Sequence, residues 1–255
     1  MPTDYKSLLL KTDTEICSMI DKALDDDISI FYDSPVIKGA GLVKIQRSKE
    51  LSEQAHAACS EICATRLLER IDTMIDKLHN IPITRESSYK IHSYQVSSDL
   101  NQSNRKEELI AHKMYNDKMT LGSLGNVMDF QTPLKNKETD SVGKIDLLSY
   151  NEKENSMSMI ELKAPQNTES LLRCVTEIYT YNKIVNKKKL LDDFGKPNAN
   201  LRMAVLVFED CRAYYQFNNC PNVRKLMYKL KVDFYAMKST DDFKITFERR
   251  CEDIR

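Results

Sequence analysis

Three residues on two neighbouring apolar segments have the types and spacing of a metal-dependent hydrolytic site. Asp146 lies in GKIDLLSY, and Glu161 and Lys163 end the next apolar run, SMSMIELK. Side chains alternate along a strand, so Glu161 and Lys163 would share one face, about 6 to 7 Å apart. A hairpin could bring Asp146 beside Glu161, and a divalent cation would neutralise the two carboxylates. Oxygen ligands favour Mg²⁺ or Mn²⁺ over zinc.

The surroundings of these residues decide between a site and a chance pattern. An aspartate followed by Glu-x-Lys is common, and Glu161 with Lys163 could be a surface pair on a strand. Here, however, the aspartate enters an apolar Leu-Leu pair, and the Glu-Leu-Lys triplet ends an apolar strand. Ala-Pro follows directly, and a helix is expected after it. This context favours a site in which the lysine handles an attacking water.

The elements that must position these residues follow from hydrophobic periodicity. We predict helices at about 104–117, 167–190 and 221–230, and strands at 126–131, 143–150, 156–163, 202–210, 232–237 and 243–248. A long helix between the third and fourth of these strands implies a crossover connection. The pattern predicts an α/β fold, with a mixed β-sheet flanked by helices.

The preceding region is predicted to be mainly helical. Thr12 and Glu15 form a capping-box pattern within a helical stretch at 4–24. Short strands are expected at 28–33, 41–46 and 87–96. A long stretch at 49–79 lacks Gly and Pro, and either two helices meet near residue 63 or one helix packs on two bodies. The polar segment 97–106 suggests a boundary between residues 1–98, the N-terminal region, and 99–255.

Composition excludes several classes of protein. The 255 residues carry zero formal net charge, so the chain as a whole is not a basic nucleic-acid binder. Seven cysteines at irregular spacing, with no CxxC, favour reduced thiols over disulfides or a zinc site. No apolar run approaches the roughly 20 residues of a membrane helix, and no signal-peptide profile is present. We therefore expect a cytoplasmic protein without a membrane partner.

The order of elements around KID and IELK resembles that of the PD-(D/E)xK nuclease superfamily, which has the restriction-endonuclease-like fold. The resemblance covers roughly residues 104–210. The segment from Glu177 to Tyr181 is similar to the Q-x3-Y motif of RecB-like members, with Glu in place of Gln. Lys-Ile-Asp stands where the family name has Pro-Asp, and DFQTPLKN is similar to an approach strand of bacterial members.

The resemblance implies a role for each matching residue. Asp146 and Glu161 would bind Mg²⁺ or Mn²⁺ together with the Leu162 backbone carbonyl. Lys163 would position or activate water and stabilise negative charge at phosphorus. Glu177 would orient Lys163 or water.

Two further assignments have alternatives. The family often places an extra acid on the helix before the sheet, here Glu107 or Glu108. We choose Glu107 because it shares a helical stripe with Ile110 and Met114, which should face the sheet. Tyr181 would contact substrate phosphate, or it is a buried tyrosine bonded to a neighbouring acid.

Two functions follow as hypotheses. The first is a Mg²⁺-dependent nuclease, a hydrolase that cleaves phosphodiester bonds in DNA. The alternative is a catalytically inactive binding or regulatory protein that keeps the nuclease fold, which the neutral charge and the long helical N-terminal portion favour. Many nucleases of this superfamily act as dimers, and the N-terminal helices could form a homodimer.

Overall fold

The computed structural model describes residues 11–40, 53–87, 106–137, 139–238 and 243–251. The predicted strand at 41–46 lies outside the described residues. So do nearly all of the predicted strand at 87–96 and of the polar boundary at 97–106. The division of the chain at residue 98 therefore stays a prediction.

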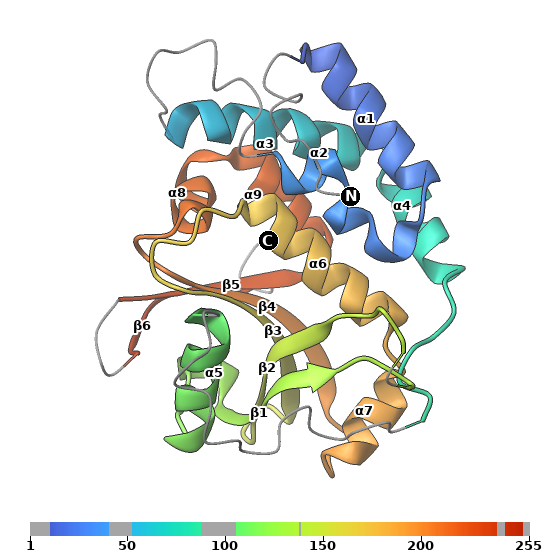
Figure 1. Ribbon diagram of the computed structural model, residues 1–255. Helices are drawn as coiled ribbons and strands as arrows, with labels where there is room; N and C mark the ends of the chain where they lie inside the picture. The colour runs from blue at the N-terminus through green and yellow to red at the C-terminus, as the bar shows by residue number, and fades with distance from the viewer. Residues whose placement is uncertain (1–10, 41–52, 88–105, 138, 239–242, 252–255) are drawn as a thin grey trace.

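The described residues form an α/β fold around one mixed, open, six-stranded sheet (Figure 1). The strands lie in chain order: β1 (Asn126–Pro133), β2 (Lys144–Asn151), β3 (Ser156–Lys163), β4 (Asn200–Phe208), β5 (Val232–Met237) and β6 (Ile245–Arg249). β1 to β3 are antiparallel, β3 to β5 are parallel, and β6 returns antiparallel to β5. The predicted mixed sheet is confirmed, including the bounds of β3 and β5.

β3 lies in the middle of the sheet, between β2 and β4, and both of its faces are covered. All eight of its residues are buried, including Glu161 and Lys163 at its C-terminal end. After β3 the chain crosses through α6 (Leu171–Ile184) and α7 (Lys187–Asp193) before it forms β4 parallel to β3. A parallel pair requires such a crossover, which carries α6 across the sheet beside the end of β3.

Helices cover the two faces of the sheet unequally (Figure 1). α5 (Lys106–Asn116) packs on β1, β2 and β3 from one side, while α6, α8 (Arg212–Asn219) and α9 (Pro221–Lys229) pack on the other. The N-terminal helices add an outer layer over α6, α8 and α9: α1 (Asp13–Asp25), α2 (Pro35–Lys38), α3 (Glu53–Glu69) and α4 (Ile71–His79). The buried apolar residues of both regions form one continuous core.

The predicted capping box at the start of α1 is confirmed. The Thr12 backbone N–H donates to Glu15 Oε2 at 2.7 Å, and the Glu15 N–H donates to Thr12 Oγ1 at 3.3 Å. Two otherwise unpaired donors of the first turn are thereby satisfied. The helix then buries Ile16, Ile20 and Leu24, spaced by four residues, against the neighbouring helices.

Two local predictions were wrong, one was confirmed only in part, and one helix was missed. Residues 28–33 form a 3₁₀ helix, η2 (Ile28–Asp33), in place of a strand, with the Asp27 side chain capping its start. Of the two alternatives for 49–79, two helices that meet are observed within residues 53–79, but they meet at Arg70, seven residues beyond the expected point. The helix expected at 167–190 is divided between α6 and α7 by Val185, and α8 was not predicted.

The seven cysteines are all free thiols. Five are buried and two, Cys17 and Cys251, are partly exposed. None of the helices in the described residues combines the length and the apolar character that a membrane span needs.

Candidate active site

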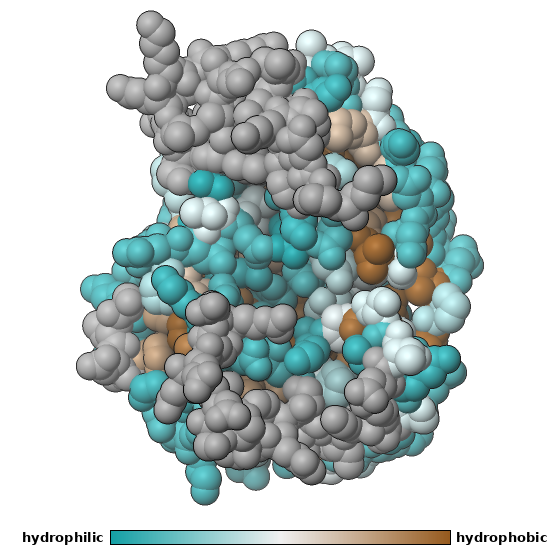
Figure 2. Space-filling view, viewed as in Figure 1, coloured by the Kyte–Doolittle hydropathy of each residue, from teal (hydrophilic) through white to brown (hydrophobic). Residues whose placement is uncertain are grey.

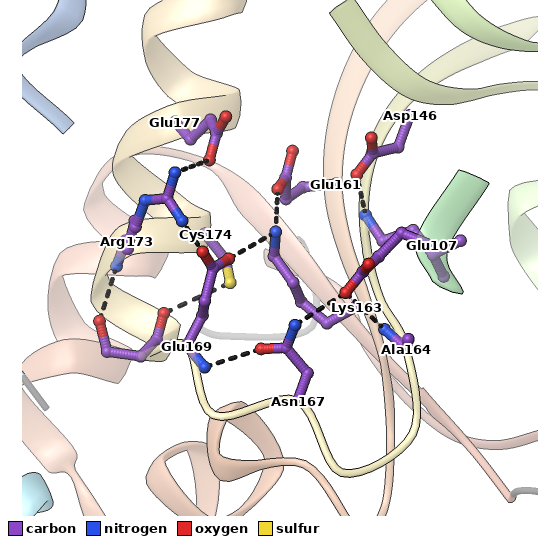
Figure 3. Close-up of polar contacts among 12 residues, drawn as sticks. Glu107, Asp146, Glu161, Lys163, Ala164, Asn167, Glu169, Arg173, Cys174 and Glu177 are labelled. Carbon is purple, nitrogen blue, oxygen red and sulfur yellow. Dashed lines mark hydrogen bonds and ion pairs between the residues drawn. The ribbon is translucent and has the colours of Figure 1, made fainter. Parts of the chain in front are cut away.

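The hairpin of β2 and β3 brings the two predicted strand carboxylates together. Leu147 pairs with Ile160, and one further step in the same antiparallel register sets Asp146 opposite Glu161. Side chains directly opposite each other on an antiparallel pair lie on the same face of the sheet. Figure 3 shows both carboxylates from adjacent strands, with Lys163 beside them.

Lys163 is held between two carboxylates. Its Nζ lies 2.6 Å from Glu161 Oε1 and 2.7 Å from Glu169 Oε2, which comes from the loop before α6. Glu161 and Lys163 are the residues predicted to share one face at the end of β3, and the structure brings them into contact. The surface-pair alternative is excluded, because their side chains are only 4% and 10% exposed.

Asp146 is fixed by two donors. The Leu162 backbone N–H donates to Asp146 Oδ2 at 2.9 Å, and Gln131 Nε2 donates to Asp146 Oδ1 at 3.0 Å. Gln131 has a left-handed φ of 50° in the middle of β1. A non-glycine residue rarely adopts this conformation within a strand. Such strained positions cluster at functional sites, and here the strained residue aims its amide at Asp146.

Glu107, from α5, contacts the backbone just beyond Lys163. Its Oε1 accepts hydrogen bonds from the Ala164 N–H at 3.3 Å and from Asn167 Nδ2 at 2.7 Å. Glu107 and Glu108 are both half-buried, and both line the same cavity. The inward direction predicted for Glu107 is therefore observed, and its contacts support the loop that follows β3.

The helix α6 brings further charged side chains to the site. Arg173 contacts Glu169, and its Nη2 lies 3.7 Å from Glu177 Oε2 and 3.2 Å from Asp33 Oδ1. Since Asp33 belongs to η2, the N-terminal region reaches the site through this contact.

Tyr181 is buried and does not line the cavity. Its hydroxyl donates to Glu177 Oε1 at 2.9 Å and lies 3.2 Å from the Tyr32 hydroxyl. A Cβ at Gly143 would lie 2.0 Å from the Tyr181 hydroxyl, so a larger residue at this position before β2 would displace the Tyr181 side chain. The hydrogen bond from Tyr181 to Glu177 matches the second of the two predictions for Tyr181, a buried tyrosine bonded to a neighbouring acid. Contact of Tyr181 with a substrate stays a prediction.

The charged side chains of the site surround a cavity of about 450 Å³. Figure 2 shows a hollowed, mainly hydrophilic surface in the middle of the face that Figure 1 presents. Six carboxylates and two cations line the cavity: Glu107, Glu108, Asp146, Glu161, Glu169, Glu177, Lys163 and Arg173. The excess of carboxylates creates a negative potential, which favours a bound cation.

Burial and mutual repulsion shift the titration of the carboxylates. Burial raises the pKa of Asp146 to about 6, although the Lys163 ammonium and the Leu162 N–H oppose the shift. Burial, followed by the charge of Glu177, raises the pKa of Glu161 well above its usual value. Burial alone would lower the pKa of Lys163, but Glu161 and its neighbours outweigh burial and raise it. Lys163 therefore remains an ammonium at neutral pH.

The donor set fits a hard divalent cation only in part. Within the described residues, no three His, Cys, Asp or Glu side chains already converge on one point as metal ligands. Mg²⁺, however, is usually held by one or two carboxylates, with water and substrate phosphate completing its shell. Asp146 and Glu161 supply those two carboxylates. The role of the Leu162 backbone carbonyl as a metal ligand stays a prediction.

Gln131, Asn167 and Glu169 line the site but were not identified as site residues from the sequence. Glu169 lies six residues after Lys163 in a loop, where no periodicity fixes its direction. Gln131 could have been found, because it lies within the predicted strand that precedes Asp146. Its direction, however, depends on its left-handed backbone conformation.

Comparison with known proteins adds no relative. No family model matches the chain, and no match was found among curated proteins or among solved structures.

Proposed function

We propose that the chain is a metal-dependent nuclease that hydrolyses phosphodiester bonds in DNA, with a restriction-endonuclease-like fold of the RecB-like variety. The observation that carries the proposal is the meeting of Asp146, Glu161 and Lys163 at one cavity, at the C-terminal end of the central strand. Two strand carboxylates that can hold a divalent cation, beside an ammonium that can stabilise negative charge, are suited to hydrolysis of a phosphodiester. In α/β sheets, ligands bind outside the carboxyl ends of the strands.

Asp146 and Glu161 would hold Mg²⁺ or Mn²⁺. When bound, the cation would activate water and neutralise charge on the phosphoryl oxygens. The excess of carboxylates around the cavity also has a consequence for substrate binding. The carboxylates would repel a DNA phosphate from the cavity until bound cations neutralise their charge. Productive DNA binding should therefore require the metal.

The side chains of the chain itself have distinct roles. The Lys163 ammonium would donate to the attacking water or to a phosphoryl oxygen and would stabilise the charge that develops there. Glu169 also contacts the Lys163 ammonium, and Glu107 supports the loop beyond Lys163. Glu177, in contact with Arg173 and Tyr181, would orient water near Lys163.

The second candidate function is that of an inactive binding or regulatory protein with a nuclease fold. The contact of Lys163 with both Glu161 and Glu169 favours it, because that contact neutralises Glu161 without a metal. The lack of three convergent metal ligands within the described residues also favours it.

Cleavage and metal binding separate the two functions. Purified protein is incubated with plasmid and linear DNA and with Mg²⁺ or Mn²⁺, and Mn²⁺ binding is measured by calorimetry. We expect cleavage that Lys163→Gln reduces by about 100-fold or more. Lys153→Gln is the matched control, because Lys153 is exposed in the turn at the far end of the same hairpin.

Thermal unfolding of each variant shows whether a loss of activity reflects a loss of structure. Cleavage that Lys163→Gln leaves unchanged would refute the proposed mechanism. Absence of both Mn²⁺ binding and DNA cleavage would favour the regulatory function.

A further inference from the structure

A second concave region lies at the opposite end of β3 from Lys163. It is a groove of about 1130 Å³, lined by Ser156 at the start of β3 and by residues of α4, α6, β4, the end of α9 and the C-terminal segment. Ligand pockets usually measure roughly 300 to 1,000 Å³, so this groove can hold more than a single small anion. None of the residues of the carboxylate cavity lines it.

The groove carries an excess of positive charge. Its charged lining consists of five basic and two acidic side chains: Lys183, Arg202, Lys229, Lys231, Arg250, Glu154 and Asp233.

Both acids already pair with arginines. Arg202 lies 2.8 Å from Asp233, and Arg250 lies 2.7 Å from Glu154. Across the described part of the chain, no carboxylate lies within ion-pair distance of the three lysines Lys183, Lys229 and Lys231. The lysines therefore leave an uncompensated positive field for an anionic ligand.

The floor of the groove contains polar groups that other described residues do not satisfy. Ser156, Tyr179 and Asn182 are each at least 94% buried. Asn182 donates only to the Met159 sulfur, at 3.9 Å, and the hydroxyls of Ser156 and Tyr179 have no hydrogen-bond partner within the described chain. These polar atoms are not sealed from solvent but reach the groove, so they can form hydrogen bonds with water or with a ligand there.

Aromatic rings border the same space. Lys183 Nζ lies 5.2 Å from the centroid of the Tyr179 ring, and the half-buried Tyr228 ring lines the wall near Lys229 and Lys231. An aromatic ring beside lysines is suited to stacking a base while the ammonium groups bind its phosphate.

We infer that this groove binds a nucleoside phosphate, either as a free nucleotide or as one unit of a single strand. The lysines would bind the phosphate, Tyr228 would stack on the base, and Ser156 and Asn182 would hydrogen-bond the edge of the base. The inference does not depend on the proposed nuclease activity, because it concerns different residues and requires no metal.

Lys231 allows a sharp test. It follows the end of α9 with a left-handed φ of 57°, a conformation that glycine adopts without strain. Lys231→Gly should therefore keep or raise the stability of the fold while it removes a groove lysine. Lys118 is the matched control: it is an exposed lysine after the end of α5 with a φ of 50°, away from the groove.

Binding is measured in EDTA with two probes, AMP by calorimetry and a fluorescein-labelled DNA strand of about ten nucleotides by anisotropy. We expect saturable binding of at least one probe, weakened about tenfold by Lys231→Gly and by Tyr228→Ala, and unchanged by Lys118→Gly. Binding of AMP identifies a nucleotide site, and binding of the strand alone identifies a nucleic-acid site. The inference is overturned if neither probe binds, or if Lys118→Gly and Lys231→Gly weaken binding equally.

Discussion

Asp146 combines a functional position with a cost in stability. Burial raises its pKa to about 6, whereas an unfolded aspartate titrates near 4. The folded chain therefore binds more protons than the unfolded chain between about pH 4 and pH 6. By linkage, the contribution of Asp146 to the free energy of unfolding falls as pH rises through that window.

Asp146→Asn removes this ionisation. Without divalent cations, we expect the variant to be more stable than the wild type at pH 7, because the wild-type side chain is ionised there at a cost. The difference should be on the order of 1 kcal/mol, since Asp146 is only partly buried and solvent screens its charge. The difference should vanish near pH 4, where the wild-type side chain is protonated. Urea denaturation in EDTA at several pH values measures it, with Glu152→Gln in the exposed hairpin turn as the control. A variant less stable than the wild type at pH 7 contradicts the assigned cause.

At the residue scale, the sequence was informative where strand alternation fixes direction. It predicted that Glu161 and Lys163 share a face and that Asp146 lies alongside them, because a two-residue repeat leaves little freedom. It did not predict that Glu169 reaches Lys163, since a loop residue has no period. It also could not reveal that Asp33 contacts Arg173, residues 140 positions apart.

At the scale of elements, a buried ion pair joins three segments. The Arg85 side chain is fully buried; it lies 2.9 Å from Asp193 at the end of α7 and donates to the Pro133 carbonyl at the end of β1. The segment after α4 is thereby attached to the sheet and to the crossover helices. A pair that is taken out of water in this way depends on both partners.

Arg85→Met should destabilise the chain by about 1 to 3 kcal/mol, because Asp193 loses its fully buried partner and keeps only the partly exposed Lys189. Denaturant unfolding at neutral pH measures the loss. Arg66→Met is the matched control, since Arg66 also contacts an aspartate, Asp21 at 2.8 Å, but its side chain is 28% exposed. Equal losses of unfolding free energy in the two variants would show that burial does not make the Arg85 pair contribute more to stability than the partly exposed Arg66 pair.

Elements were predicted best where long apolar patterns define them. β3 and β5 have the predicted bounds, whereas the apolar run at 28–33 was ambiguous between a strand and a short helix. The Asp27 cap and the burial of Phe31 and Tyr32 decide for the 3₁₀ helix. α8 could have been predicted, because Ala213, Gln216 and Phe217 have helical spacing and form its buried face.

At the scale of the whole molecule, the N-terminal region contributes to the candidate active site. Tyr32 lies edge-on to Tyr181 with ring centroids 5.6 Å apart, and Asp33 contacts Arg173. The position of η2 is therefore coupled to Arg173 and through it to Glu177. The homodimer expected through the N-terminal helices stays a prediction.

Asp33→Asn tests this coupling. It removes a carboxylate that competes for Arg173, so the Arg173 charge should act more strongly on Glu169 and Glu177. We expect Mn²⁺ to bind severalfold more weakly, as measured by calorimetry. Asp25→Asn is the control, because Asp25 lies in the same region in an exposed pair with Lys77. Identical Mn²⁺ affinities of the two variants would contradict the coupling.

The eight residues of β3 separate the groove from the carboxylate cavity. Seven steps along an extended strand span about 23 Å, and the strand is held on both sides by its neighbours. Two small ligands can therefore occupy both places without touching. A longer ligand with suitable groups at both ends would gain avidity only if its linker matches this fixed span. The length of β3 therefore sets the linker length that bivalent binding would need.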